Sequence, residues 1–425
     1  MMRLFLSLGL LLLFILPQLS CQRAGQELKW LKKNSIPIAS VDGNDFSDLA
    51  FLQEKLEDIR LVQIGESSHG AAEFYQLKTR LVEYLHQEMN FDVLVIEGGF
   101  GDINLAWLHQ EDQDAKSLMY NSVFGNFRAE EMLPLFEYAK TQARGDRPLA
   151  LAGPDCQSSS NYFNNFLIDF LRKYNTELSR DVEYNFMTTS LLYGLIPDST
   201  QLIAAIRTNE RVINRVLDFL ENNEAKIRED FPQKPLLAAF TRRALENYLE
   251  YWALDYRAIR LQQQFALRDR IMAENLMWLA DVAYPNQKII YWAHNAHIGT
   301  ESNSVDIFGK PLKMQGNYVA DRFGKQVYNI GLYASGGELF RHWMRDVQPF
   351  KDDSIGGIGE RFGRLPKAIN FLELRGQQPG KGKDWLFKPL PAFELESGGK
   401  ILFTPTKKYD ALIVVKKVKG PKFFE

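Results

Sequence analysis

The sequence predicts an α/β fold in which a mainly parallel sheet is flanked by helices. Short apolar runs alternate with longer segments in which apolar residues recur three and four positions apart, as expected for strands followed by amphipathic helices. Several apolar runs end beside a glycine and an acidic residue or histidine. From roughly residue 161 to 285 the pattern is helical and rich in charge, without strand-like runs. We therefore expect a large helical insertion that caps the cleft of the sheet.

The first 20 residues have the pattern of a signal peptide. Arg3 supplies the positive charge, and the apolar run Leu4–Leu16 is too short to span a membrane as a helix. Ser20 before Cys21 is typical of a lipoprotein cleavage site, with Cys21 as the lipidated residue; cleavage of a plain secreted protein is the alternative. We expect a bacterial cell-envelope protein, lipid-anchored or periplasmic or secreted, that contacts the membrane only through a lipid anchor.

Composition argues against several classes of partner and site. The 425 residues carry a formal net charge of -2 and are 45% hydrophobic, which is the balance of a soluble globular protein. A nucleic-acid partner is not expected, because it would require a broad basic surface. Only two cysteines occur, Cys21 and Cys156, so neither a disulfide framework nor a cysteine-rich metal site is expected.

Residues 21–425 are predicted to form one domain. Residues 36–48 look like a loop that enters it, and the segment after Gly70 has the spacing of an amphipathic helix, with Phe74 and Leu77 on one face. Because helical segments separate the predicted strands, most strands should run parallel. The predicted strands are Leu61–Ile64, Asp92–Ile96, Pro148–Ala152, Lys288–Ala293, Val327–Leu332 and Ala411–Val415.

Four of these strands are followed closely by side chains that can carry chemistry. The first leads into Glu66, the second into Glu97, the third into Asp155 and the fourth into His294. Ligands of an open α/β sheet bind outside the carboxyl ends of the strands, so we expect these four side chains to meet at one edge. This convergence is the strongest indication of an active site that the residues alone provide.

Glu66 and His69 are predicted to form an acid–base pair in the loop Gly65–Gly70. A helix that begins after His69 disfavours the imidazolium, whereas Glu66 favours it and can fix the tautomer. His294 and His297 lie three residues apart in the loop after the fourth strand. Either ring could polarise a carbonyl, stabilise an oxyanion or protonate a leaving alkoxide.

Other kinds of hydrolytic site are disfavoured. The chain has no Gly-x-Ser-x-Gly nucleophile elbow, and Ser67 and Ser68 lie in a different spacing. Cys156 is expected to be a buried thiol rather than a nucleophile. The two histidines after the fourth strand do not have the spacing of a helical zinc site, so no cofactor is predicted, although a divalent metal held by histidines and carboxylates stays open.

Taken together, the motifs after the strands resemble the erythromycin esterase family. The Gly-Glu-x-x-His-Gly block combined with Ala-His-Asn-x-His is specific, whereas either block alone is weak. The likeness covers nearly the whole chain after the signal segment. It is carried by Gly65-Glu66-Ser67-Ser68-His69-Gly70, Glu73-Phe74, Glu97, Gly153-Pro154-Asp155, Ala293-His294-Asn295-Ala296-His297-Ile298, residues 268–275 and residues 316–324.

The resemblance implies hydrolysis of a macrolide lactone ester by a water molecule, without a covalent intermediate. It implies that His69 is the general base with Glu66 beside it, that His294 is the second essential histidine, and that Glu97 is an acidic group of the same cleft. Family members commonly carry arginine where this chain has Lys78, so the cationic role is open and Arg80 is its alternative carrier. The supporting or substrate-binding positions are His297, Asp155, Lys78, Arg80 and Glu73.

Three functions are compatible with these residues. The first is a metal-independent hydrolase whose partner is a small-molecule ester or lactone, with a macrolide as the leading substrate. The second is a metal-dependent hydrolase of another ester at the cell envelope. The third is a non-catalytic binding lipoprotein on the same scaffold, which ranks last because the acidic residue and the three histidines of the site are all present.

Overall fold

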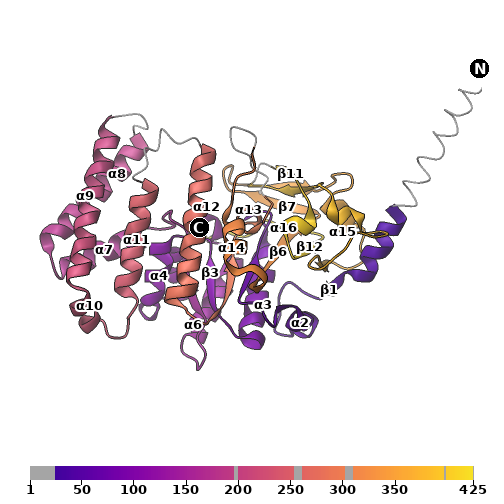
Figure 1. Ribbon diagram of the computed structural model, residues 1–425, viewed down its shortest axis with the longest axis horizontal. Coiled ribbons are helices and arrows are strands. Elements are labelled where there is room, and N and C mark those ends of the chain that lie inside the picture. Colours follow the sequence, from indigo (N-terminus) through magenta and orange to yellow (C-terminus); the bar gives the residue numbers. More distant parts are fainter. Residues whose placement is uncertain (1–23, 196–199, 253–260, 302–309, 397–398, 425) are drawn as a thin grey trace, which may run out of the picture.

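Figure 1 shows a computed structural model, which describes residues 24–195, 200–252, 261–301, 310–396 and 399–424. The predicted signal segment and Cys21 lie outside these residues. An eight-stranded sheet runs through the centre of the molecule in the order β1-β9-β12-β6-β2-β5-β3-β4. Within the described ranges, no helix is both long and apolar enough to cross a membrane.

The six predicted strands are all present, and they form the parallel part of the sheet. Every pairing from β12 to β4 is parallel. The predicted fold class, a mainly parallel sheet flanked by helices, is therefore confirmed. These strands are β2 (Leu61–Ile64), β3 (Phe91–Ile96), β4 (Ala150–Ala152), β5 (Lys288–Trp292), β6 (Val327–Ala334) and β12 (Ala411–Val415).

Two further strands extend one edge of the sheet in the antiparallel sense. They are β1 (Ile36–Ile38), which pairs with β9 (Ile369–Glu373), and β9 itself, which pairs with β12. The prediction of a loop over residues 36–48 is thus wrong for its first three residues. A three-residue edge strand that contains a proline, Pro37, is too short to show the alternation by which strands are recognised.

Helices cover both faces of the sheet, and alternate strand residues feed two separate cores. In β2, Leu61 packs into one core and Val62 into the other. The helix α3 (Ala72–Met89) packs on the face of Val62, and α12 (Leu261–Trp278) packs on the face of Leu61. Because both faces are covered, the central strands are apolar along nearly their whole length.

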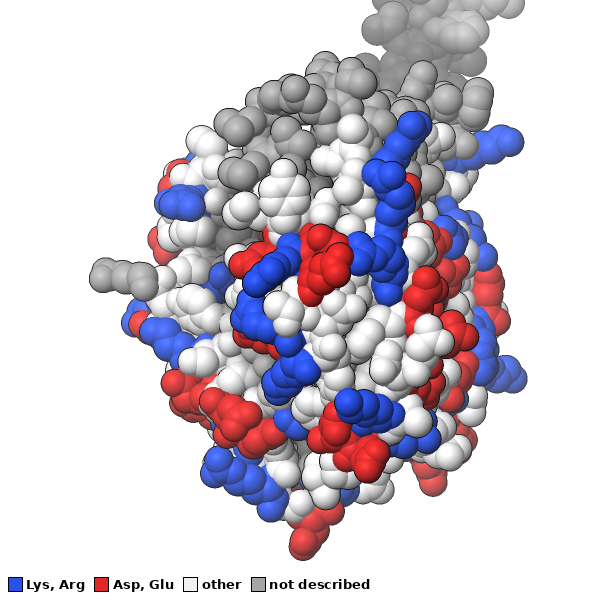
Figure 2. Space-filling model, turned by 90° about the vertical axis from the view of Figure 1, so that its left-hand side faces the viewer, with Lys and Arg blue, Asp and Glu red and all other residues white. Residues whose placement is uncertain are grey.

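The region from residue 162 to residue 283 consists of helices in its described parts. In Figure 1, helices α7 to α11 gather at one end of the molecule beyond α4 (Phe100–Leu108), against which α11 packs. Lysine, arginine, aspartate and glutamate side chains are intermingled on this end (Figure 2). The helices are α7 (Tyr162–Arg172), α8 (Thr176–Leu195), α9 (Thr200–Asn222), α10 (Glu224–Asp230), α11 (Leu237–Trp252) and α12, followed by a π-helical turn over Leu279–Ala283.

Two hairpins lie at the opposite end, on the side away from α7 to α11 (Figure 1). One joins β7 (Gly336–Arg341) to β8 (Asp346–Lys351), and the other joins β10 (Leu390–Glu394) to β11 (Gly399–Phe403). Other α-helices of the described chain are α2 (Leu52–Leu56), α5 (Ala115–Ser122), α6 (Leu133–Gln142), α13 (Asn295–Ile298), α14 (Gln315–Phe323), α15 (Ile358–Gly363) and α16 (Pro405–Lys408), and residues 24–34 are also helical.

Candidate active site

The carboxyl ends of four neighbouring strands meet at one edge of the sheet. In sheet order these are β2, β5, β3 and β4, and the residues that follow them include Glu66, His294, Glu97 and Asp155. All four side chains are buried. Hydrogen bonds, ion pairs and ring contacts join them in one network.

The loop after β2 fixes His69 through a buried carboxylate. Glu66 Oε1 lies 3.0 Å from His69 Nδ1, and because an ionised carboxylate only accepts, the ring proton sits on Nδ1. No described residue hydrogen-bonds to the other ring nitrogen, Nε2. Lys78 on α3 donates to the second Glu66 oxygen at 2.5 Å, and both side chains have no exposed surface. The Lys78 ammonium also lies 4.3 Å from the centre of the Trp292 ring, a cation–π contact.

Gly65 allows the loops after β2 and β5 to come together. A Cβ atom at this position would lie 2.0 Å from the Asn295 side-chain oxygen, so only glycine fits. The Asn295 backbone N–H donates to the Glu66 carbonyl at 2.9 Å, and its side-chain amide pairs with the backbone of β6. The rings of His69 and His294 are held 5.2 Å apart, centre to centre.

The carboxylates around His69 favour its charged form. Burial alone would lower the pKa of His69, but the hydrogen bond to Glu66 and the charges of Glu396, Glu97 and Glu66 outweigh burial and raise the pKa above 6.5. The expected effect of the following helix, which disfavours the imidazolium, is therefore not the dominant one. Neutral His69, the form that can act as a base, prevails only above this raised pKa.

His294 presents a hydrogen-bond donor. Its Nδ1 accepts a hydrogen bond from the backbone N–H of Ala296 at 3.1 Å, so in the neutral ring the proton is on Nε2. The backbone N–H of His294 donates to Glu97 Oε2 at 2.9 Å, which ties the end of β5 to the end of β3. His294 Nε2 lies 3.5 Å from the carboxylate of Glu396.

Acidic and basic side chains alternate in a row that includes Glu97. His297 lies between Asp269, at 2.8 Å, and Glu97, at 3.2 Å, and Arg268 bridges Glu97 and Asp155. Burial alone would lower the pKa of His297, but the two carboxylates raise it to about 10, so the ring is an imidazolium at neutral pH. Burial opposes the ionisation of Glu97, yet the charges and hydrogen bonds of its cationic neighbours, His297 first, hold the pKa of its carboxyl well below the ordinary value.

Comparison with known proteins identifies the family. Residues 86–418 match the family model described as erythromycin esterase. The chain belongs to the erythromycin esterase family. YbfO of Bacillus subtilis (strain 168), which is named as a hydrolase, is 30% identical over 401 residues, or 87% of each chain. Erythromycin esterase type II of Escherichia coli is 23% identical over 340 residues, or 73% of this chain and 77% of that one. The family and these relatives support a hydrolase.

Solved structures of related proteins share the fold. A succinoglycan biosynthesis protein superposes with a TM-score of 0.75 at 17% identity, covering 94% of this chain and 98% of that one. A mutant of the erythromycin esterase EreC in its open conformation superposes with a TM-score of 0.62 at 17% identity, covering 90% and 97%. At these identities the likeness concerns the fold alone.

Three residues of the network of this erythromycin esterase family member carry no predicted role. Arg268 and Asp269 come from α12, inside a block whose likeness to the family is visible in the sequence without indicating what the side chains do. Glu396 follows β10, and no sequence signal marks it. Its carboxylate accepts hydrogen bonds from the His69 backbone N–H at 3.1 Å and from the Ser68 hydroxyl at 3.3 Å.

Two of the predicted site residues, Arg80 and Glu73, lie outside the network. Arg80 pairs with Asp48 and with nearby backbone carbonyls, so it does not replace Lys78 as the cation beside Glu66. Residues two positions apart on a helix point to different sides, which explains why only Lys78 reaches the site. The carboxylate of Glu73 accepts a hydrogen bond from the backbone N–H of a residue near the C-terminus, at 2.7 Å, and so ties down that segment.

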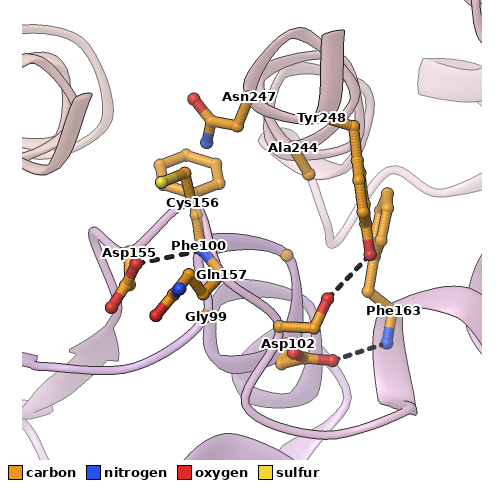
Figure 3. A pocket seen from close by; sticks show the side chains of 12 residues that line it. Gly99, Phe100, Asp102, Asp155, Cys156, Gln157, Phe163, Ala244, Asn247 and Tyr248 are labelled. Carbon is orange, nitrogen blue, oxygen red and sulfur yellow. Dashed lines mark hydrogen bonds between the residues drawn. The ribbon is translucent and has the colours of Figure 1, made fainter. Parts of the chain in front are cut away.

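A small pocket lies beside Asp155, between the loop after β4, the start of α4 and α11 (Figure 3). Cys156 and Asn247 are among the residues that line it. Burial and the Asp155 charge raise the pKa of the Cys156 thiol well above its ordinary value, so the protonated thiol prevails, as expected for a buried cysteine rather than a nucleophile.

No described group of three or more histidine, cysteine, aspartate or glutamate side chains is arranged to hold a metal ion. Both ring nitrogens of His297, and Nδ1 of His69, already face carboxylates. The groups that this edge of the sheet offers for chemistry are imidazole, carboxylate, ammonium and guanidinium.

Proposed function

We propose that this protein hydrolyses a carboxylic ester or lactone by direct attack of a water molecule that His69 activates. The observation that carries the proposal is that two neighbouring imidazoles are held in different tautomers. In His69 the proton is held on Nδ1 by Glu66 and Nε2 is left as the acceptor, whereas in His294 the proton is held on Nε2. The ring centres are 5.2 Å apart, so in one addition step His69 can take a proton from the attacking water while His294 donates a hydrogen bond to the carbonyl oxygen.

The proposed reaction proceeds in two steps. His69 Nε2 removes a proton from water while the water oxygen bonds to the carbonyl carbon, and the carbonyl π electrons move onto oxygen. His294 Nε2–H donates a hydrogen bond to this oxyanion. The oxyanion then re-forms the carbonyl, the bond to the alcohol oxygen breaks, and the leaving alkoxide takes the proton from the His69 imidazolium. The products are a carboxylic acid and an alcohol, and the enzyme returns to its starting state.

Charged side chains next to the His69 and His294 rings support these two reaction steps. When His69 accepts a proton, the Glu66 carboxylate beside it offsets the new charge, and Lys78 holds the second oxygen of that carboxylate. The cations His297 and Arg268 lie against Glu97, whose carboxylate holds the backbone of His294. These groups are fixed before the reaction begins, which is the condition under which charge stabilisation is most effective.

A macrolide lactone is the proposed substrate, because the chain belongs to the erythromycin esterase family and a relative carries that name. The predicted signal segment and Cys21 would place the activity at the cell envelope.

The test is a mass-spectrometric screen of the purified protein against macrolides and a panel of simpler lactones and esters. The proposal expects a product heavier than the substrate by one water molecule, and a rate lower by at least about 10²-fold for His69→Ala. It is overturned if folded protein leaves every ester intact, or if His69→Ala is as active as the wild type. A protein-bound acyl group after acid quenching would contradict direct attack by water. Stoichiometric zinc or manganese, with activity lost to a chelator and restored by that metal, would favour the metal-dependent alternative.

A further inference from the structure

We propose that Glu396 is a positioning residue through which the β10–β11 hairpin holds the His69 loop and the His294 ring in one reactive arrangement. The inference rests on the proposed function of the two histidines. It assigns a role in the active site to a segment that lies 327 positions after His69 in the chain.

One oxygen of Glu396 holds the backbone that carries His69. Oε1 accepts hydrogen bonds from the His69 N–H and from the Ser68 hydroxyl. The Ser68 oxygen in turn accepts from the backbone N–H of Gly70 at 2.9 Å. A single carboxylate oxygen thereby restrains the loop on both sides of the proposed base.

The other oxygen of Glu396 faces His294. Oε2 and His294 Nε2 are 3.5 Å apart, and each is buried without a hydrogen-bond partner among the described residues. At this separation the contact is at the outer limit of a hydrogen bond, so the carboxylate and the ring N–H attract each other mainly through their charges.

The hairpin is itself anchored to the same loop. The backbone N–H of Leu395 donates to the carbonyl of Ser67 at 2.9 Å. Leu395 and Glu396 together therefore bind three consecutive residues of the loop, 67–69. Glu394, the last residue of β10, is fully buried and binds Lys408 and Tyr333. Glu396 is thus held in place through the backbone of the preceding residue, Leu395, as well as through its own side chain.

The negative charge of Glu396 also acts on His69. Burial would raise the pKa of the Glu396 carboxyl, but the nearby His294 ring, and the charge and backbone N–H of His69, lower it to about 2, so the carboxyl is ionised at neutral pH. Its charge is one of those that raise the pKa of His69. The titratable groups that face His69 among the described residues are Glu66, Glu97, Glu396, His294, His342 and Tyr75, whose hydroxyl donates to the His69 carbonyl.

The experiment compares Glu396→Gln with Glu396→Ala in the full-length protein. Glutamine keeps an oxygen that can accept from the His69 N–H but removes the charge, whereas alanine removes both. With ¹³C-labelled histidine, the six histidines can be titrated by NMR and assigned by single histidine substitutions. Glu396→Gln should lower the pKa of His69 by on the order of one unit, which is the scale for loss of one nearby charge. Glu338→Gln, at an exposed position on β7, is the control and should leave it unchanged.

The activity arm uses whichever ester the wild type hydrolyses. Glu396→Gln should shift the acid limb of kcat/KM to lower pH, with a plateau within about threefold of the wild type. Glu396→Ala should lower kcat by at least about tenfold with little change in KM, because the loop that carries the base is released.

A His69 pKa that is the same in folded Glu396→Gln as in the wild type overturns the role of Glu396, whether or not a substrate is known. If no ester is hydrolysed but the pKa shifts as expected, the proposed function fails while the contact from the hairpin to His69 stands. If Glu396→Ala does not fold, the glutamine variant still decides the question.

Discussion

The buried pair of Lys78 and Glu66 offers the sharpest test of how the site is built. Neither side chain has any exposed surface, and their charged atoms are 2.5 Å apart. Methionine has nearly the volume of lysine, so Lys78→Met leaves no cavity but leaves the buried Glu66 charge without its lysine partner. Removing one partner of a buried ion pair costs about 3–5 kcal/mol. Because His69 also contacts Glu66 and can take up a proton, we expect about 3 kcal/mol, the low end of this range.

The assay is urea denaturation at neutral pH followed by tryptophan fluorescence, with the free energy of unfolding extrapolated to water. The double variant Glu66→Gln with Lys78→Met contains no unpaired buried charge. Its loss of unfolding free energy should therefore be smaller than the sum of the losses in the two single variants. Where Lys78→Met folds, the unscreened Glu66 should raise the pKa of His69 further and lower activity at neutral pH. A loss below about 1 kcal/mol for Lys78→Met, or strict additivity in the double variant, would refute the reasoning.

Three further outcomes are expected. The pKa of His297 is raised from 6.5 to about 10, so the stability of the wild type relative to His297→Gln should be greatest below about pH 6.5 and should decline as pH rises towards 10, as measured by urea titrations across that range. Arg268→Lys should lower kcat/KM by at least about tenfold, because lysine cannot bind Asp155 through two nitrogens and reach Glu97 as well. Arg80→Met should leave kcat per folded molecule within about twofold of the wild type, although it lowers the melting temperature.

The part of the site that lies directly after strands is predictable from the sequence. Glu66, Glu97, Asp155 and His294 each follow an apolar run, and the topology of a parallel sheet brings such positions to one edge without any knowledge of contacts. The same reasoning finds the six parallel strands. It does not find β1 or β9, which pair antiparallel at one edge of the sheet. These segments are too short for a pattern of alternating polar and apolar residues to be recognised.

The residues that the sequence does not reveal reach the site from elements other than the strand ends. Arg268 lies within a helix that carries a second arginine, Arg270, two positions later, and periodicity does not say which arginine turns towards the sheet. Glu396 lies next to a hairpin turn far along the chain, where a glutamate would ordinarily be solvated. The choice of Lys78 over Arg80 is decided by helix geometry once the direction of α3 is known, which the sequence alone does not provide.

The pH dependence of kcat/KM, measured for wild type and for His69→Gln on one hydrolysed ester, tests the role of His69 most directly. If neutral His69 removes the proton from water, wild-type activity rises with pH through a single limb centred above 6.5, and the residual activity of the variant lacks that limb. A variant that keeps the same limb, or that retains more than about a tenth of the plateau rate, would show that another group activates the water.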